Sequence, residues 1–335
     1  MTEYRGTFYL NGEYKKGIYY TDEKIFEENE NIKEEAFYIT KPINAHTHIG
    51  DSFIKDEPTG SLEEVVGPGG FKIKNLKNAG NPKIIKEMKN TISYMKNIGT
   101  GSFFDYREAG SKSIETLRAI REAEPNAITL GRPENIEDLE TIKDIIQGVG
   151  FSAVSDDDND LIISIGKKAK KMGLIVSIHF SENRQEPIGP LYDLKPDLLI
   201  HCTALKKDQL IPLKEITDNI AITPRSNYFF NIRPDYSVFV ESGFKLMLGT
   251  DNVMTVNPSI FEEMDFLYRI QKNTSRISHE DIMKMAFENP YNFLKQMNIK
   301  IQKKWLKFSG KIPTPYQIVT KFHLMNPVET TEIEL

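Results

Sequence analysis

The segment KPINAHTHIGDSF, residues 41–53, places two histidines one residue apart at the end of an apolar run. Alternate side chains of an extended strand point to the same side. His46 and His48 therefore face the same way, and Thr47 between them faces the other way. Two imidazoles held side by side suit two ligands of one metal ion, provided that further ligands come from elsewhere in the chain.

Around this segment, apolar runs of strand length alternate with amphipathic stretches of helical length. We expect eight strands, over residues 37–45, 100–106, 127–130, 148–154, 174–179, 198–201, 220–223 and 245–249. Helices are expected between them, over residues 84–97, 113–123, 136–147, 160–172, 206–215 and 234–242. Such alternation is typical of parallel βα units, and a TIM-like (β/α)8 barrel of the α/β class is the leading architecture. An open doubly wound sheet is the alternative that periodicity leaves open.

The two ends of the chain differ from this pattern because both are β-prone. Residues 3–20 predict a hairpin that turns at Asn11-Gly12, and residues 299–323 contain further β-prone pieces. We therefore expect a small β-sandwich built from residues 1–40 and 298–335. Residues 41–297 would form the barrel.

Composition excludes several classes of protein. The 335 residues include 43 Lys and Arg against 48 Asp and Glu, a net charge of −5, which does not favour nucleic acid or an anionic membrane as partner. We find no apolar run of membrane-spanning length and no signal-peptide pattern at the N-terminus. Cys202 is the only cysteine, so an intrachain disulfide is excluded and a cytoplasmic location is expected.

Three further apolar runs end in a side chain that can bind a metal, namely His179, His201 and Asp251. In parallel βα barrels, residues at the C-terminal ends of strands line the mouth where chemistry takes place. We therefore expect these three residues to meet His46 and His48. Histidine and carboxylate ligands suit a catalytic Zn²⁺ or Fe²⁺ better than a structural zinc site, which is usually rich in cysteine.

The motifs NAHTH, HFSE, IHCTAL, TPRSN and LGTDN follow one another along residues 38–295. In this order they resemble the amidohydrolase superfamily, in particular its cytosine deaminase, adenosylhomocysteine deaminase and triazine hydrolase branch. The resemblance implies a distorted barrel with a small β-sandwich from both chain ends. It also implies a ligand set and two further roles. The metal ligands would be His46, His48, His179 and Asp251, and Asp251 would also lie close to the nucleophilic water. Glu182 would act as the proton shuttle, and His201 would orient water or substrate.

The number of metal ions follows from a lysine that is absent. Binuclear members of the superfamily bridge two metals with a modified lysine at the end of the fourth strand, but here that strand runs GVGFSAVSDD, residues 148–157. We therefore expect one divalent metal, Zn²⁺ first, with Fe²⁺ or Mn²⁺ as alternatives. A zinc site of the cytidine deaminase type is excluded, because it needs paired cysteines.

Metal-activated water and a nearby carboxylate predict hydrolysis of a carbon–nitrogen bond. Glu182 would take a proton from water and deliver it to the leaving nitrogen. The resemblance implies deamination of a small heterocyclic amine, with release of ammonia, because this is the commonest use of these motifs in the resembled branch. Hydrolytic ring opening of a cyclic amide or amidine, as in imidazolonepropionase or dihydroorotase, is the alternative. A non-catalytic metal-binding homologue is disfavoured, because a structural metal needs no shuttle such as Glu182.

Side chains just beyond the predicted strand ends are candidates for substrate contacts. Arg107, Arg132 and Arg225 would either bind an anionic small molecule or pair with nearby carboxylates, and the sequence leaves both open. Ser226 and Asn227 would bond the substrate or form a turn. The glycine-rich segment 50–78 is either a lid or a surface excursion. A homodimer is a further option, although the sequence specifies no interface.

Overall fold

The computed structural model describes residues 2–33, 36–154, 158–273 and 277–335. Its larger sheet has the strand order β12-β11-β10-β9-β8-β7-β6-β5-β13, and every neighbouring pair is parallel. The strands are β5 (Ile43–His48), β6 (Ser102–Arg107), β7 (Ile128–Gly131), β8 (Gly148–Phe151), β9 (Ile175–Phe180), β10 (Leu198–His201), β11 (Asn219–Ile222), β12 (Lys245–Leu248) and β13 (Asp251–Asn252).

The sheet closes on itself through its last two strands. β12 and β13 stand at opposite ends of the strand order, yet only Gly249 and Thr250 separate them along the chain. Thr250 N donates to His46 O at 2.9 Å, and Asn44 Nδ2 donates to Thr250 Oγ1 at 2.8 Å. β12 and β13 are therefore two halves of one bent eighth strand. The expected TIM-like barrel is confirmed, and the open doubly wound sheet is wrong.

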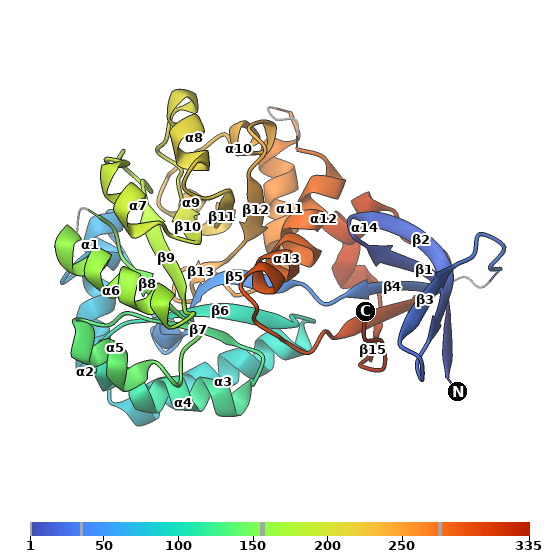
Figure 1. Ribbon diagram of the computed structural model, residues 1–335, viewed down its shortest axis with the longest axis horizontal. Helices are drawn as coiled ribbons and strands as arrows, with labels where there is room; N and C mark the ends of the chain where they lie inside the picture. Colours follow the sequence, from blue (N-terminus) through green and yellow to red (C-terminus); the bar gives the residue numbers. More distant parts are fainter. Residues whose placement is uncertain (1, 34–35, 155–157, 274–276) are drawn as a thin grey trace.

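Helices surround this barrel, as Figure 1 shows. They are α3 (Asn81–Asn97), α4 (Ile114–Ala123), α5 (Ile136–Ile142), α6 (Asn159–Lys171), α7 (Gly189–Leu194), α8 (Lys207–Lys214), α9 (Pro224–Phe229), α10 (Ser237–Glu241), α11 (Ile260–Gln271), α12 (His279–Phe287) and α13 (Asn289–Gln296). α6 illustrates why they form. Its buried residues Ile162, Ile165 and Ala169 recur at helical spacing, and Gly173 with φ +75° turns the chain back into β9. No helix in the described parts of the chain is long and apolar enough to cross a bilayer.

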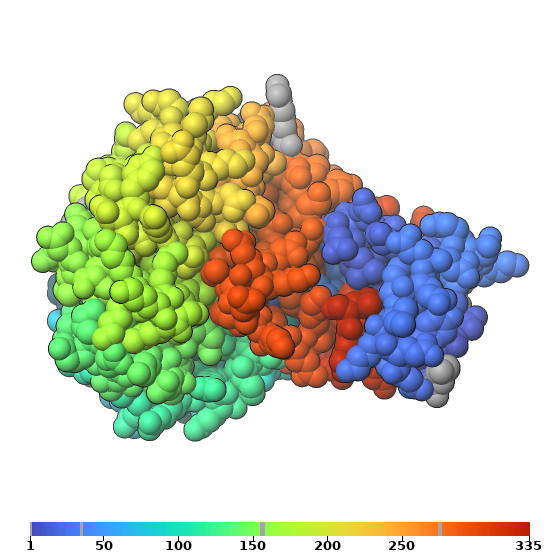
Figure 2. Space-filling view, in the orientation of Figure 1, coloured from blue at the N-terminus to red at the C-terminus, as the bar shows by residue number. Residues whose placement is uncertain are grey.

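The chain ends form an accessory sheet at one side of the molecule, drawn blue and red in Figures 1 and 2. Its strand order is β15-β14-β4-β1-β2-β3. The strands are β1 (Glu3–Leu10), β2 (Glu13–Tyr20), β3 (Ile25–Glu28), β4 (Ala36–Thr40), β14 (Trp305–Ser309) and β15 (Val328–Thr330). The predicted hairpin is present, because β1 and β2 pair through Asn11 and Gly12, with φ of 53° and 80°.

The accessory sheet is joined to the barrel through one of its faces. Tyr9, Phe37 and Phe308 belong to the same apolar cluster as Met283 of α12 and Ile318 of α14 (Pro315–Lys321). Phe8, Tyr38 and Trp305 of the same three strands, together with Tyr19 of β2, form a separate cluster on the other face. The sheet therefore buries two apolar faces, and one of them fixes the chain ends to the barrel.

Three expectations about individual elements need correction. The expected strand 37–45 is two strands, β4 and β5, which separate at Pro42, a residue without an N–H for a strand ladder. Part of the β-prone C-terminal stretch is helical, because Thr314 and Gln317 form a capping box that starts α14. The segment 50–78 contains two helices, α1 (Leu62–Val66) and α2 (Phe71–Asn78), where only a loop was expected.

Candidate metal centre

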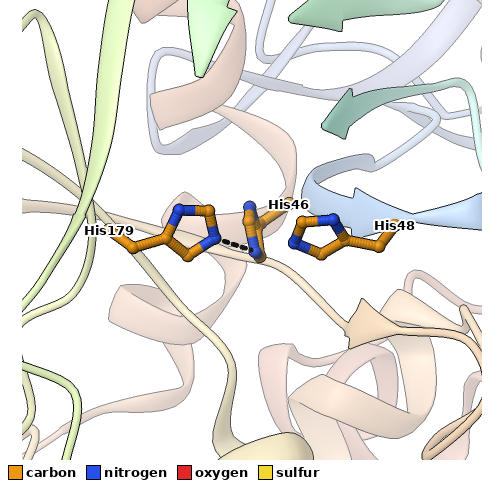
Figure 3. Close-up of side chains that lie close together, drawn as sticks. All are labelled: His46, His48 and His179. Atoms are coloured by element: carbon orange, nitrogen blue, oxygen red, sulfur yellow. Dashed lines mark hydrogen bonds between the residues drawn. The ribbon is translucent and has the colours of Figure 1, made fainter. Parts of the chain in front are cut away.

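Five strand-end side chains meet in one cluster at the mouth of the barrel. His46 and His48 come from β5, His179 from β9, His201 from β10 and Asp251 from β13. His46 Nε2 lies 3.3 Å from His179 Nε2 (Figure 3). The same nitrogen lies 3.3 Å from Asp251 Oδ1. Ligand atoms of His46, His48 and His179, and likewise those of His46, His201 and Asp251, lie within 4.8 Å of one another. The structure thus brings together all the residues predicted as metal ligands.

The outer nitrogens of three of these imidazoles are held by neighbouring groups. His179 Nδ1 lies 2.8 Å from Phe151 O, and a carbonyl can only accept, so Nδ1 carries the proton. His48 Nδ1 lies 3.1 Å from Glu108 Oε1, and His201 Nδ1 lies 3.1 Å from Thr223 Oγ1. At His48 and His179, where the outer partner can only accept, such bonds direct Nε2 and its lone pair toward the centre of the cluster. The donor set fits one divalent cation.

Burial favours the neutral form of His48, His179 and His201, which is the form that binds metal. Burial, with a smaller contribution from Lys72, lowers the pKa of His48 to about 3. Burial also lowers the pKa of His201 to about 3, and that of His179 well below its usual value. Burial would raise the pKa of Asp251, but its hydrogen bond to His46 holds that pKa well below its usual value.

The backbone at these strand ends is in the left-handed region, which is unfavourable for residues other than glycine. The φ angles are 69° at His201, 59° at Cys202, 65° at Asp251 and 48° at Ser181. Such conformations cost about 1–3 kcal/mol each and persist where the surrounding structure holds them. They turn the chain sharply beyond β9, β10 and β12, where the clustered side chains lie.

Glu182 faces the same cluster, three residues after His179. Its Oε2 lies 3.4 Å from His201 Nε2, and its Oε1 accepts a hydrogen bond from Asn227 Nδ2 at 3.3 Å. Burial, and then the negative charge of Asp251, raise the pKa of Glu182 well above its usual value. The carboxyl group therefore holds a proton at pH values where an exposed glutamate would already be ionised.

Ser226 and Asn227 contact catalytic candidates, which differs from the expected contact with substrate. Ser226 Oγ donates to Asp251 Oδ2 at 2.6 Å, and Asn227 Nδ2 donates to Glu182. Tyr236 OH donates to Asn227 Oδ1 at 2.8 Å, which fixes which end of the amide faces Glu182. Both residues are 0% exposed. They position Asp251 and Glu182.

The three predicted substrate arginines have different surroundings. Arg107 is buried and paired with Asp105. Arg225 is paired with Glu263 and Glu262. These pairs are the structural alternative that the sequence had left open. Arg132 differs, because its Nε donates to Gly150 O at 3.3 Å while its side chain lines the cavity beside the cluster.

A cavity of about 400 Å³ opens above the cluster. Strand-end residues line one side, and α1 and α2 cover the other with Leu62, Val66 and Ile73. Glu63 of α1 forms an exposed ion pair with Arg184, at 3.3 Å, across the mouth. Segment 50–78 thus contributes a wall of the cavity, and its movement as a lid stays a prediction.

Two contacts near the site, one made by Lys72 and one by Tyr236, could not be predicted from the sequence. Lys72 of α2 is 4% exposed, and its Nζ lies 2.6 Å from Glu108 Oε1, the oxygen that holds His48. Glu108 follows β6, about sixty residues along the chain from His48. The second contact is the hydrogen bond from Tyr236 OH to Asn227 Oδ1. Neither contact follows from periodicity or from a motif, because both depend on how distant segments pack.

The amino-acid sequence is similar to those of known proteins. The Amidohydrolase family matches residues 41–298. The chain is 33% identical over 319 residues to an uncharacterized protein of Methanocaldococcus jannaschii, covering 88% of this chain and 82% of that protein. It is 28% identical over 256 residues to a protein of Archaeoglobus fulgidus provisionally named an aminohydrolase, covering 75% and 76%.

A solved structure supports the fold independently. The aminofutalosine deaminase of Helicobacter pylori, in complex with methylthio-coformycin, has a TM-score of 0.72 and 16% sequence identity, with 99% of each chain covered. At that identity the likeness shows the fold. It includes the accessory sheet as well as the barrel, because nearly the whole chain is covered.

Proposed function

The chain belongs to the amidohydrolase family, and on that premise we propose that it is an aminohydrolase that replaces the amino group of a small heterocyclic amine by oxygen and releases ammonia. The observation that carries the proposal is the place of Glu182. It faces His201 at 3.4 Å, beside the metal cluster, with a raised pKa. A purely structural metal site would need no such proton carrier.

Four residues would hold the metal ion, namely His46, His48, His179 and Asp251. We propose Zn²⁺, because imidazole and carboxylate donors with an open position are typical of catalytic zinc, with Fe²⁺ or Mn²⁺ as alternatives. A divalent cation at this place lowers the pKa of water and stabilises developing negative charge. A single ion is proposed because β8, the fourth barrel strand, ends at Phe151 and is followed by Ser152 and Ala153, without a lysine.

Each residue of the site would then have its own role in the reaction. Glu182 accepts a proton from water and carries it to the leaving nitrogen, so that the carbon gains oxygen, the carbon–nitrogen bond breaks and ammonia leaves. Asn227 holds the carboxyl group of Glu182 in place, and Ser226 does the same for Asp251. His201 would donate to the substrate or the attacking water, because Thr223 fixes its ring at Nδ1.

Ammonia release from a panel of aminated purines, pyrimidines, pterins and triazines tests this function. Metal-loaded protein should release ammonia from at least one ring type, and Glu182→Gln should abolish the release while keeping its metal. Glu122→Gln, on the outer surface of α4, is the matched control and should retain activity. Hydrolysis of a cyclic amide without ammonia would instead support ring opening. If the metal-loaded protein neither releases ammonia nor hydrolyses a cyclic amide, the proposal is contradicted.

A further inference from the structure

A second chamber adjoins the cavity above the metal cluster. It has a volume of about 750 Å³ and shares Val66, Ile73, Glu108, Arg132 and Ser152 with the first cavity. Single small-molecule sites commonly have roughly 300–1,000 Å³. Each of the two spaces is therefore large enough for a ligand group of its own. A substrate that consists only of a heterocycle at the metal would leave the second chamber unused.

The second chamber has a mostly apolar wall built from several elements. Its apolar residues beyond the junction come from α2, α3, β8 and α6, and include Leu76, Ile84, Phe151, Leu161, Ile162 and Ile165. These elements lie together at one side of the barrel (Figure 1). A surface of this composition favours groups that gain by leaving water.

The charged groups around the second chamber are matched in sign. Arg107 is paired with Asp105, and Lys112 lies 3.6 Å from Glu134 at the exposed edge. The exposed Lys77 and Asp158 add one charge of each sign, and so do Arg132 and Glu108 at the junction with the first cavity. Among the residues that the structure describes, the chamber therefore does not offer the excess of cations that a phosphate group would require.

We propose that the second chamber binds an uncharged, mostly apolar substituent of the substrate. Resting on the proposed aminohydrolase function, this makes the substrate an N-substituted heterocyclic amine and not a free base. The amino-bearing ring lies at the metal cluster, and the substituent passes between Ile73 and Arg132 into the chamber. Arg132 and Ser152 stand at that passage and are polar enough to bond a linking atom.

Matched pairs of ligands test the proposal on the metal-loaded protein. Each ring of the panel is used with an N-methyl and with an N-butyl substituent, and both binding by calorimetry and ammonia release are measured. Each buried methylene contributes about a fourfold gain in affinity, so the butyl form of the correct ring should bind at least about tenfold more tightly. The ratio kcat/KM should rise with it.

Two variants narrow the chamber from opposite walls. Leu161→Trp, on α6, and Leu76→Trp, on α2, should each remove the advantage of butyl over methyl and leave the N-methyl compound almost unaffected. Ile211→Trp is the matched control, because Ile211 is 74% exposed on α8 and lies outside the chamber lining. Melting temperatures of all three variants verify folding.

The possible results separate this proposal from the proposed function. If the N-butyl compound binds more tightly than the N-methyl compound, and both tryptophan variants abolish this difference, the chamber proposal is supported even without ammonia release. Ammonia release with equal use of methyl and butyl forms overturns the chamber proposal and leaves the aminohydrolase function intact. Absence of a butyl advantage in every ring of the panel, in binding and in turnover, also overturns it.

Discussion

Nζ of Lys72 lies 2.6 Å from Oε1 of Glu108, although one residue belongs to a helix over the cavity and the other follows a barrel strand. The same oxygen lies 3.1 Å from Nδ1 of His48. Lys72 and the neighbouring charges hold the pKa of Glu108 well below its usual value, although burial opposes them. Glu108 is therefore a carboxylate that orients a metal ligand, and Lys72 keeps it charged.

Lys72→Met should weaken metal binding. Loss of the ammonium leaves a buried carboxylate without its cation and disturbs the bond that orients His48. Loss of a partner of this kind typically lowers metal affinity by about 10–100-fold. Competition with a chromophoric chelator measures the dissociation constant. Lys74→Met, at an exposed position on the same helix, is the control. Equal metal affinity of the two variants would contradict this role of Lys72.

Tyr236→Phe should lower turnover without loss of metal. The missing hydroxyl frees the amide of Asn227 to rotate, and Glu182 then loses a fixed hydrogen bond. A net loss of about 1 kcal/mol corresponds to a fall in kcat of roughly fivefold to tenfold. Steady-state kinetics and metal content are measured on the same sample. Tyr228→Phe, on the neighbouring α9, is the control, and a similar fall there would show that the effect is not specific to Tyr236.

The metal-free protein should become less stable as the pH falls below about 6.5. The pKa of His48 and of His201 is about 3 in the folded protein, against about 6.5 in an unfolded chain. Between these values the unfolded chain binds more protons, so unfolding becomes easier as the pH falls. From pH 7.5 to 5.0 the expected loss is up to about 2 kcal/mol for each histidine.

Urea unfolding at the two pH values measures this dependence. His201→Asn should lose less stability on acidification than the unaltered protein. His323→Asn, at an exposed position, is the control and should behave like the unaltered protein. An identical pH dependence in His201→Asn would contradict the assignment.

Arg225→Met should destabilise the fold and leave metal affinity unchanged. Arg225 bonds Glu263, a carboxylate that is 0% exposed, and also Glu262. Removing one partner of a buried ion pair costs about 3–5 kcal/mol. Arg269→Met breaks an exposed helical pair with Asp265 and should cost well under 1 kcal/mol. Weakened metal binding in Arg225→Met, without destabilisation, would contradict this account.

The sequence predicted the barrel because its signals are local. Apolar runs such as Leu198–His201 and the glycines after α3, α6 and α10 follow directly from periodicity and turn chemistry. The strand ends in turn predicted where His179, His201 and Asp251 would meet. The sequence did not predict contacts between segments that are far apart along the chain. The burial of Lys72 beside Glu108 and the positioning roles of Ser226 and Asn227 depend on tertiary packing alone.

Titration of metal-free protein with Zn²⁺ tests the central claim most directly, with ammonia release followed on a substrate from the panel. We predict that activity rises linearly and saturates at one equivalent, and that Glu182→Gln binds the same single equivalent without gaining activity. Saturation at two equivalents, or full activity of Glu182→Gln, would contradict the account of one metal ion and one proton-carrying glutamate.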